Sequence, residues 1–491
     1  MKDYQFGNYL CELRNRRGLS QFQLGTLVGL TDKAVSKWEN GDAKPRLDTC
    51  YRLAEVLGVS IDALLSCKHQ AAAHWGKQQD ALNARIWKEA YDRLAAYCSK
   101  RPAVFWSRLA SEEAALQGTD AIQGYAVLGC IKQRAREANT AILVNGSIGA
   151  SFAAWLLGAT EINPLTPYYI CPACGCTAFV PDAGDGFDLP PKKCICGQEM
   201  QRDGHNIPFE GYAKAEHNGT CIEIRVSERF KPEAIKALLE FYDGAAEVLP
   251  VMVHGEGDAW CMEQYVVLSE QNEKIEVSKD GFFHIEAESY WRWKKKGITF
   301  AFLSGDLLNK IEEMRDESGC GLPDPLQQIT PQMAEILYQK KSEKLSFITK
   351  VLSETPHNFD SLIRLELLSR ATGAWTGNGE SLLKQGRALF HEIPAAREDV
   401  FNAVGNALVK NNIFDKGLAL YVMENTRKGL FCSRGMPEEM EQMLLSLGLP
   451  EWYPSYLKQV KYLWPKAHII EQLLAEIVEE WYHAKTGGKN V

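Results

Sequence analysis

Helix start and stop signals recur within residues 6–65, and this pattern constrains the fold more than any other feature of the sequence. Ser20 and Gln23, three residues apart, form a capping box that opens a second helix. Apolar residues recur at helical spacing between the signals. Four helices are followed by a glycine stop, namely Gly18, Gly29, Gly41 and Gly58. The segment is therefore predicted to be an all-α domain of five helices, the last of them short.

The run LSQFQLGTLVGLTDKAVSKWENG within this segment resembles the Cro/repressor-type (XRE) helix-turn-helix family. The resemblance covers residues 1–66 and implies that the second helix of the motif enters the major groove of double-stranded DNA. It implies contacts to base edges or phosphates for the following side chains: Gln21, Thr31, Asp32, Lys33, Ser36, Lys37, Asn40 and Lys44. The alternative is a helical bundle of similar sequence that binds protein.

The charge of this domain is modest for a partner as acidic as DNA. Residues 1–66 contain nine Lys or Arg and eight Asp or Glu, and the whole chain carries a formal charge of -8. A DNA-binding face must therefore be local. Since a single domain of this charge would bind weakly, we expect a homodimer on DNA.

Targeting signals are not apparent in the sequence. The first ten residues lack an apolar core segment. The most apolar stretch, residues 141–159, is interrupted by Asn145, Gly146 and Ser147. We therefore expect a cytoplasmic protein without a membrane span.

Five of the 14 cysteines fall in one short stretch and predict a metal site. Clustered cysteines in a long chain without a signal peptide indicate metal binding rather than disulfides. Cys171 and Cys174 form a C-x-x-C pair, and Cys194 and Cys196 form a C-x-C pair. Two such pairs can bind one Zn²⁺ tetrahedrally, with Cys176 as an alternative ligand. The zinc would be structural, because four thiolates leave no open coordination position; the alternative is free thiols.

A short apolar strand, residues 142–144, runs into a Gly/Ser turn and then a helix. The residues of this turn are Gly146, Ser147, Gly149 and Ser151. Backbone N–H groups at such a helix start can bind a phosphate. The alternative is a plain connection, because Gly/Ser turns often precede helices.

Residues 146–210, with NPLTPYYICPACGCTAFV and GFDLPPKKCICGQEMQRDGHNIPFEGY, resemble the palm of PolC-type bacterial replicative DNA polymerase. The motifs TGAWTGNGESLL, ENTRKG and LPEWYPSYLKQVKYLWPKAH resemble the fingers region of that family. The resemblance implies an α+β nucleotidyltransferase-like palm over 85–345, with a zinc module at 165–211. A helical, fingers-like region would follow over 346–491, and residues 67–84 would form a linker. It also makes replication proteins or a nucleotide candidate partners.

Four basic residues in the fingers-like motifs are candidates for binding nucleic acid or nucleotide. They are Arg427, Lys428, Lys461 and Lys466. The alternative is that they lie on solvated helix faces and that the neighbouring aromatic residues form core.

Three palm carboxylates hold two Mg²⁺ ions in the polymerase family, and the resemblance places their positions here. Cys221 stands at the first, Glu223 at the second and Ala301 at the third. A thiol and a methyl group are poor replacements for hard oxygen ligands, so Mg²⁺ binding is not expected. Asn145, directly before the Gly/Ser turn, stands where the family usually has an arginine.

These features favour a DNA-binding regulator with a catalytically degenerate PolC-like body, which would serve as a platform for sensing, dimerisation or partner binding. Two alternatives remain. One is a nucleotidyl transferase with residual activity that uses Glu223 together with Asp306 or Asp258. The other is an interaction protein that mimics the replicase.

Overall fold

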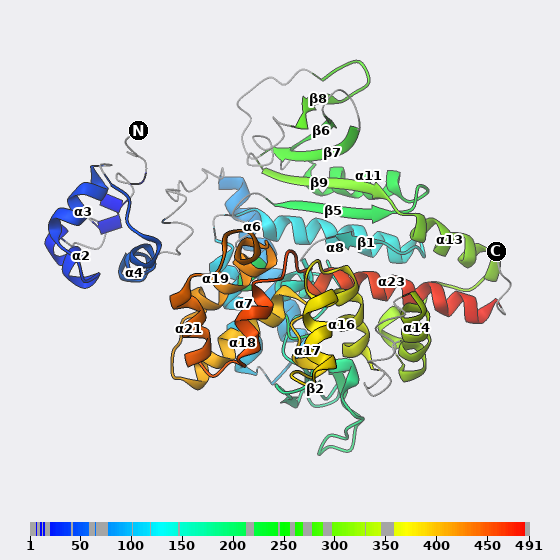
Figure 1. Cartoon of the computed structure of the whole chain (residues 1–491). Helices are drawn as coiled ribbons and strands as arrows, with labels where there is room; N and C mark the ends of the chain where they lie inside the picture. The colour runs from blue at the N-terminus through cyan, green and yellow to red at the C-terminus, as the bar shows by residue number, and fades with distance from the viewer. Residues whose placement is uncertain are drawn as a thin grey trace. The chain divides into compact units, whose positions relative to one another are not determined.

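The chain, described here by a computed structural model, folds into two compact units, Met1–Trp75 and Gly76–Val491 (Figure 1). The structure describes residues 6, 10, 11, 13, 14, 20–40, 43–57, 64, 77–100, 102–117, 119–145, 148–212, 220–243, 246–255, 261–268, 277–287, 297–328, 330–344 and 358–486.

The first unit is helical, as predicted. Helices α2 (Gln21–Leu27), α3 (Asp32–Glu39) and α4 (Leu47–Leu57) enclose a core of buried apolar side chains. Leu24, Val28 and Val35 are fully buried within it. Gly18, Gly41 and Gly58, which were predicted to end helices, lie outside the described residues.

Local hydrogen bonds explain why α2 and α3 begin where they do. The Ser20 hydroxyl accepts the Gln23 N–H at 3.1 Å, and the Gln23 side chain accepts the Ser20 N–H at 2.8 Å. The predicted capping box is thus confirmed. Thr31 caps α3 by accepting the Ala34 N–H at 3.4 Å. Gly29 adopts a φ of 71° in the turn between the two helices, a conformation that favours glycine.

Three helices open the second unit: α6 (Lys77–Tyr97), α7 (Ala103–Ala115) and α8 (Ala121–Glu137). Helix α6 begins inside the stretch 67–84 that we assigned to a linker, so residues from Lys77 onward are helical instead. The reason is an apolar face at intervals of four residues, formed by Leu82, Ile86, Ala90 and Leu94, which are all buried.

A six-stranded mixed sheet forms the centre of this unit. Its strands are β1 (Leu143–Asn145), β5 (Cys221–Val226), β6 (Glu247–His254), β7 (Cys261–Leu268), β8 (Phe283–Glu286) and β9 (Gly297–Ser304). Their order in the sheet is β1-β5-β9-β7-β6-β8. β5 and β9 run parallel, as do β6 and β8, and the remaining neighbours are antiparallel.

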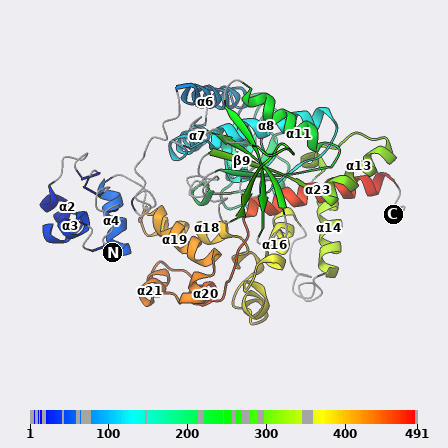
Figure 2. The same ribbon diagram turned by 90° about the horizontal axis from the view of Figure 1, so that it is seen from above.

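The two faces of the sheet carry different helices. Helices α8 and α11 (Lys231–Tyr242) lie on one side, and the C-terminal helix α23 (Lys466–Lys485) lies on the other (Figure 2). In β5, Ile222, Ile224 and Val226 are buried, whereas the alternate residues are more exposed. Helix α8 packs closely against the buried face of β5. A Cβ on Gly124 of that helix would approach the Ile222 side chain to 2.6 Å.

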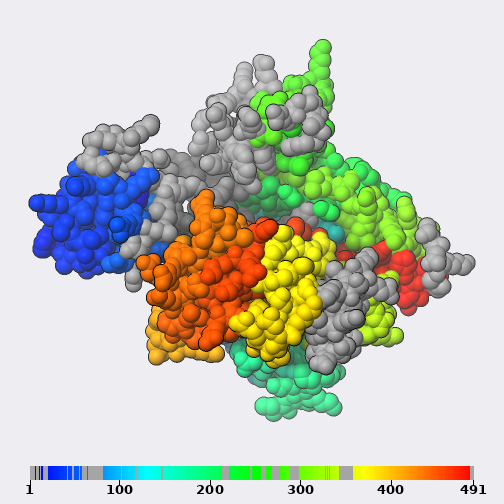
Figure 3. All heavy atoms as spheres, viewed as in Figure 1, coloured from blue at the N-terminus to red at the C-terminus, as the bar shows by residue number. Residues whose placement is uncertain are grey.

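A second, three-stranded antiparallel sheet carries the cysteine cluster. Its strands are β2 (Tyr168–Ile170), β3 (Thr177–Phe179) and β4 (Gln201–Asp203), in the order β3-β2-β4. This part of the unit, drawn in green-cyan, projects below the helical region in the space-filling view (Figure 3).

Helices make up most of the chain beyond the six-stranded sheet. The longer ones are α13 (Asp306–Ser318), α14 (Pro331–Lys344), α16 (Phe359–Arg370), α18 (Arg397–Lys410), α19 (Lys416–Arg427) and α21 (Glu438–Ser446). The predicted order of a mixed middle and a helical C-terminal region is therefore confirmed. One cluster of buried side chains includes both Leu82 of α6 and Ile477 of the C-terminal helix α23, so the two ends of this unit share a core.

Among the described helices, none has the length and apolar character needed to span a lipid bilayer.

Candidate functional site

The predicted DNA-contacting residues gather at α3 and the segment that follows it. Five of them are exposed, namely Thr31, Asp32, Lys33, Lys37 and Asn40, and Ser36 is half-buried. Lys44, just beyond the helix, is also exposed. The first turn of α3 is ordered by the Thr31 cap and by Asp32, whose carboxylate accepts the Lys33 N–H at 2.9 Å. The helix thus presents a continuous polar face to solvent.

Gln21 has a structural role that the sequence did not indicate. Its side-chain amide donates to Glu39 Oε2 at 2.7 Å. The Arg14 guanidinium also donates to both oxygens of Glu39, at 2.6 and 3.1 Å. This pairing raises the pKa of Arg14. Because Gln21 and Arg14 lie 18 and 25 residues before Glu39, no local spacing could have revealed the cluster, which joins α2 to the end of α3.

Four cysteines converge beside the three-stranded sheet, as their spacing predicted. The Sγ atoms of Cys171, Cys174, Cys194 and Cys196 all lie within 4.8 Å of one another. The Cys171–Cys196 and Cys174–Cys194 sulfur distances are both 3.5 Å. These distances exceed the roughly 2.05 Å of a disulfide bond. They approach the separation of about 3.8 Å expected for thiolates around a tetrahedral Zn²⁺. The cluster can therefore hold a metal ion such as zinc.

Two tight turns bring the ligand pairs together. The Gly175 N–H donates to the Cys171 carbonyl at 2.9 Å, and the Gly197 N–H donates to the Cys194 carbonyl at 2.8 Å. Both glycines have positive φ values, 67° and 88°, which side chains with a Cβ rarely adopt. Cys176, the alternative ligand, lies outside the group of four. The ammonium of Lys100 donates to its sulfur at 2.9 Å and lowers the pKa of the thiol.

The Gly/Ser turn before α9 (Phe152–Leu156) binds a carboxylate of the protein itself. Glu112 of α7, which is fully buried, accepts the Ser151 hydroxyl at 2.8 Å. It also accepts the backbone N–H groups of Phe152 and Ala153, at 2.9 and 3.0 Å. Arg108 donates to the same carboxylate at 2.5 Å. The N–H groups expected to bind a phosphate are therefore already occupied.

This arrangement corrects the prediction for the turn. Gly149 and Ser151 are both buried, and Ser151 serves as the N-cap of α9. A Cβ on Gly149 would approach Ile162 to 2.9 Å, so packing accounts for this glycine. Gly146 and Ser147 lie outside the described residues.

The three palm positions lie together on neighbouring strands. The parallel ladder pairs Glu223 of β5 with Ala301 of β9, and Cys221 with Thr299. Asn145 of β1 lies opposite Glu223 on the other edge of β5. Glu223 is exposed, Cys221 is half-buried and Ala301 is fully buried. Of the three predicted ligand positions, Glu223 alone carries a carboxylate. Asp306 is exposed at the start of α13, and Asp258 lies outside the described residues.

Close groups of three or more potential metal ligands are rare among the described residues. Within the parts of the chain that the structure describes, the four cysteines form the one such group whose ligand atoms are close enough to share an ion. Glu223 therefore has no second and third carboxylate beside it among these residues.

The comparisons with known proteins match both units. Residues 12–64 match the family described as "Helix-turn-helix". The chain is 27% identical over 407 residues to the "DNA polymerase III PolC-type" of Ureaplasma parvum serovar 3, which covers 69% of this chain and 28% of the relative. It is 25% identical to the proteins of the same description from Staphylococcus saprophyticus and Bacillus subtilis. Those matches cover 82% and 81% of this chain and 32% of each relative.

The chain joins a helix-turn-helix domain to a PolC-related body. It spans about a third of the length of the curated relatives that it matches.

The four basic candidates of the PolC-related body differ in their surroundings. Arg427 and Lys428 both pair with Glu424, and the Lys428–Glu424 distance is 2.8 Å. Lys461 is exposed. Lys466 is buried, and its ammonium donates to the carbonyls of Gly184 and His205 at 3.3 and 2.9 Å. Lys466 is therefore an internal residue, which corrects its prediction as a nucleic-acid- or nucleotide-binding candidate. Its carbonyl partners are distant in sequence, so no local pattern indicates them.

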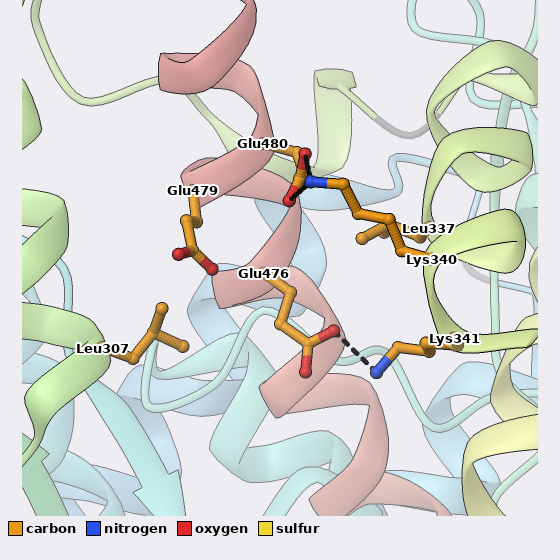
Figure 4. Close-up of a pocket in the computed structure, with 7 residues that line it drawn as sticks. All are labelled: Leu307, Leu337, Lys340, Lys341, Glu476, Glu479 and Glu480. Carbon is orange, nitrogen blue, oxygen red and sulfur yellow. Dashed lines mark hydrogen bonds and ion pairs between the residues drawn. The ribbon is translucent and has the colours of Figure 1, made fainter. Parts of the chain in front are cut away.

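A cavity of about 270 Å³ lies between α13, α14 and α23 of the body (Figure 4). Its charged side chains are matched in pairs. Lys341 contacts Glu476 at 2.8 Å and Glu366 at 2.7 Å, and Lys340 contacts Glu480 at 2.5 Å. Glu479 also lines the cavity and pairs with a lysine of α13. Two ammonium groups and three carboxylates line the cavity.

Proposed function

We propose that this protein is a sequence-specific DNA-binding regulator whose PolC-related body no longer catalyses nucleotide transfer. The observation that carries the proposal is the contrast between its two units. The helix-turn-helix unit has an ordered motif with an exposed polar face on α3. In the body, Ala301 of β9 pairs with Glu223 of β5, and Cys221 lies two residues before Glu223 on the same strand, so the three positions hold one carboxylate.

The first unit supports recognition of duplex DNA. Lys33 and Lys37 project from the exposed face of α3, one near the start of the helix and one in its last turn. A helix in the major groove can place such side chains on phosphates or on the acceptor atoms of guanine. The Arg14–Gln21–Glu39 cluster holds α2 and α3 together and so presents α3 as a rigid element.

The low charge of the first unit favours binding as a homodimer. Residues 1–66 carry nine basic and eight acidic side chains, so one copy gains little from phosphate contacts. Two copies on a pseudo-palindromic site would double the number of contacts. The body would then supply the dimer contact, and the cysteine cluster would bind a structural Zn²⁺.

Chemistry at the palm positions supports the loss of catalysis. Two-metal nucleotidyl transfer needs several carboxylate oxygens that hold two Mg²⁺ ions about 4 Å apart. The methyl group of Ala301 provides no ligand, and a thiol such as that of Cys221 is too soft to compete for Mg²⁺. The turn before α9 does not offer its N–H groups to a phosphate, since they bind Glu112.

Binding to the upstream DNA of the protein's own gene tests the first half of the proposal. Fluorescence anisotropy should show a saturable complex that competes poorly with random duplex. Lys33→Ala and Lys37→Ala should each weaken binding about 10-fold, the size of a lost base contact. Lys88→Ala, which removes an exposed charge from α6, should leave binding unchanged. Equal binding to random and upstream duplex would contradict sequence-specific regulation.

Primer extension with Mg²⁺ on the same full-length protein tests the second half. We expect no incorporation above a buffer control, while binding of the duplex is recorded in parallel. Incorporation that persists through purification and disappears in Glu223→Gln would show that the body is an active nucleotidyl transferase, and would overturn the proposal.

A further inference from the structure

Two histidines face each other on β6 and β8, the last two strands in the order of the six-stranded sheet. His254 is the last residue of β6, and His284 lies on β8, which pairs with β6 in parallel (Figure 1). His254 Nε2 lies 2.7 Å from His284 Nδ1. The ring centroids are 5.0 Å apart and the planes differ by 22°, so the imidazoles meet nearly in plane with their nitrogens pointing at each other.

A carboxylate lies within hydrogen-bond distance of the far nitrogen of the His284 ring. Asp280 Oδ2 lies 2.9 Å from His284 Nε2, the nitrogen that faces away from His254. Asp280 is itself held in a tight turn, where its other oxygen accepts the Phe282 N–H at 3.2 Å. A carboxylate bonded to the distal nitrogen is the usual partner of a metal-ligating histidine, because it sets the tautomer and the direction of the ring.

Further ligand-type side chains flank His254 on the same face of the sheet. The register places Cys261 of β7 opposite His254, and Glu286 of β8 opposite it on the other side. Paired residues on adjacent strands project to the same face. Both side chains are exposed, as is His284, so an ion can reach this end of the sheet from solvent.

We propose that His254 and His284 are ligands of a second metal site, which takes a borderline transition-metal ion such as Zn²⁺ through His254 Nε2 and His284 Nδ1. Asp280 is the positioning residue for His284. Imidazole nitrogens favour such ions over Mg²⁺ or Ca²⁺. This site is separate from the cysteine cluster in its residues and in its ligand chemistry, and it does not depend on the proposed function.

The geometry requires only a small adjustment for an ion to enter. Two imidazoles on a tetrahedral Zn²⁺ have nitrogens about 3.3 Å apart, given metal–nitrogen bonds of about 2.05 Å. The present separation is 2.7 Å. Since His284 is exposed, a modest rotation of its side chain opens that distance. Water completes the coordination, because no third ligand atom among the described residues lies close enough to share the ion, so we expect weaker binding than at four thiolates.

Zinc stoichiometry of the untagged full-length protein tests the proposal. Equilibrium dialysis against micromolar free Zn²⁺, followed by elemental analysis, should give two ions per chain for the wild type. His254→Ala and His284→Ala should each give one ion. Retention of that one ion shows that the cysteine cluster, and hence the fold around it, is intact in the variant.

A matched control and a positioning variant sharpen the test. His391→Ala removes an exposed histidine from another part of the body and should keep two ions. Asp280→Asn should weaken the second site by about 10–100-fold while the first ion remains, the usual effect of losing such a carboxylate. One ion in the wild type, or two ions in His254→Ala, would overturn the proposal and leave the pair as a surface hydrogen bond.

Discussion

The carboxylate of Glu112 serves the body as an internal anion at the start of α9. It accepts hydrogen bonds from one hydroxyl and two backbone N–H groups and forms an ion pair with Arg108. The Glu112 carboxylate thus occupies the helix start that the sequence predicts as a phosphate site. The sequence could show the turn but not its partner, because Glu112 lies 39 residues before Ser151.

Replacement of this carboxylate should be costly. Glu112→Gln would leave Arg108 without its buried counter-charge and would turn an amide N–H toward backbone donors. We expect the free energy of unfolding to fall by about 3–5 kcal/mol, as when one partner of a buried ion pair is removed. Urea unfolding followed by circular dichroism measures this loss. Glu113→Gln, which removes the charge of a half-buried carboxylate but keeps a carbonyl acceptor for the Tyr91 hydroxyl, should cost at most about 1 kcal/mol. Equal losses would contradict the special role of Glu112.

His468 gives the body a pH dependence of known sign. Burial, followed by the nearby guanidinium groups of Arg370 and Arg225, lowers its pKa from 6.5 to about 4. Its ring stacks on Trp464 and faces the side-chain amide of Gln472. Between these pKa values the unfolded chain binds a proton that the folded chain does not. His468 therefore contributes stability that is present above about pH 6.5 and is lost as the pH falls toward 4.

The measurement compares wild type and His468→Gln by urea unfolding at pH 7, 6 and 5. Because glutamine does not titrate, the wild type should lose more stability than the variant over this interval. Other groups titrate alike in both proteins, so their effects cancel in the difference. A constant difference across the three pH values would contradict the lowered pKa.

At the scale of elements, signals between nearby residues predicted helix starts and turns correctly, whereas pairings between distant strands could not be predicted. The capping box at Ser20 and the Gly29 turn follow from residues a few positions apart, and both occur as predicted. The start of α6 was misplaced because its first turn, at Lys77, is polar and its apolar face begins only at Leu82. The order of β6, β7 and β8 depends on register across many residues, which hydrophobic patterning does not determine.

The cysteine module is the element whose chemistry the sequence predicted best, because each ligand pair is local. Cys174→Ser should remove the ion bound by the four cysteines, and the residues around the three-stranded sheet should then become sensitive to protease. Cys176→Ser is the matched control. It removes a neighbouring thiol that pairs with Lys100, and it should retain the ion. Zinc content after gel filtration and limited proteolysis report the two effects. Loss of the ion in Cys176→Ser but not in Cys174→Ser would reverse the ligand assignment.

At the scale of the whole body, side chains from its two ends meet in shared clusters. Leu143 of β1 packs with Val478 and Tyr482 of α23, although more than 300 residues of sequence separate them. Lys466, at the start of α23, bonds carbonyls beside the cysteine module and lies 3.9 Å from the carboxylates of Asp185 and Asp360. No local pattern in the sequence indicates these long-range contacts.

Two lysine variants test whether Lys466 has this internal, structural role. Lys466→Met would leave buried acceptors and carboxylates without their cation, and the body should lose about 3–5 kcal/mol of stability. Lys461→Met, at an exposed position five residues earlier, should change stability by less than about 0.5 kcal/mol. Urea unfolding of both variants checks this contrast. A stable Lys466→Met protein would contradict the internal role of Lys466.

The pairing of β5 with β9, together with the packing of β1 against α23, also determines when the body can form during synthesis. β5 must wait until residue 304 has left the ribosome before its parallel neighbour is present, and β1 must wait for residues near 478. The hairpin of β6 and β7 and the helical first unit need no such delay, since their contacts are close in sequence. A ribosome that has made most of this chain thus carries a folded helix-turn-helix unit followed by a body whose central strands still lack their partners.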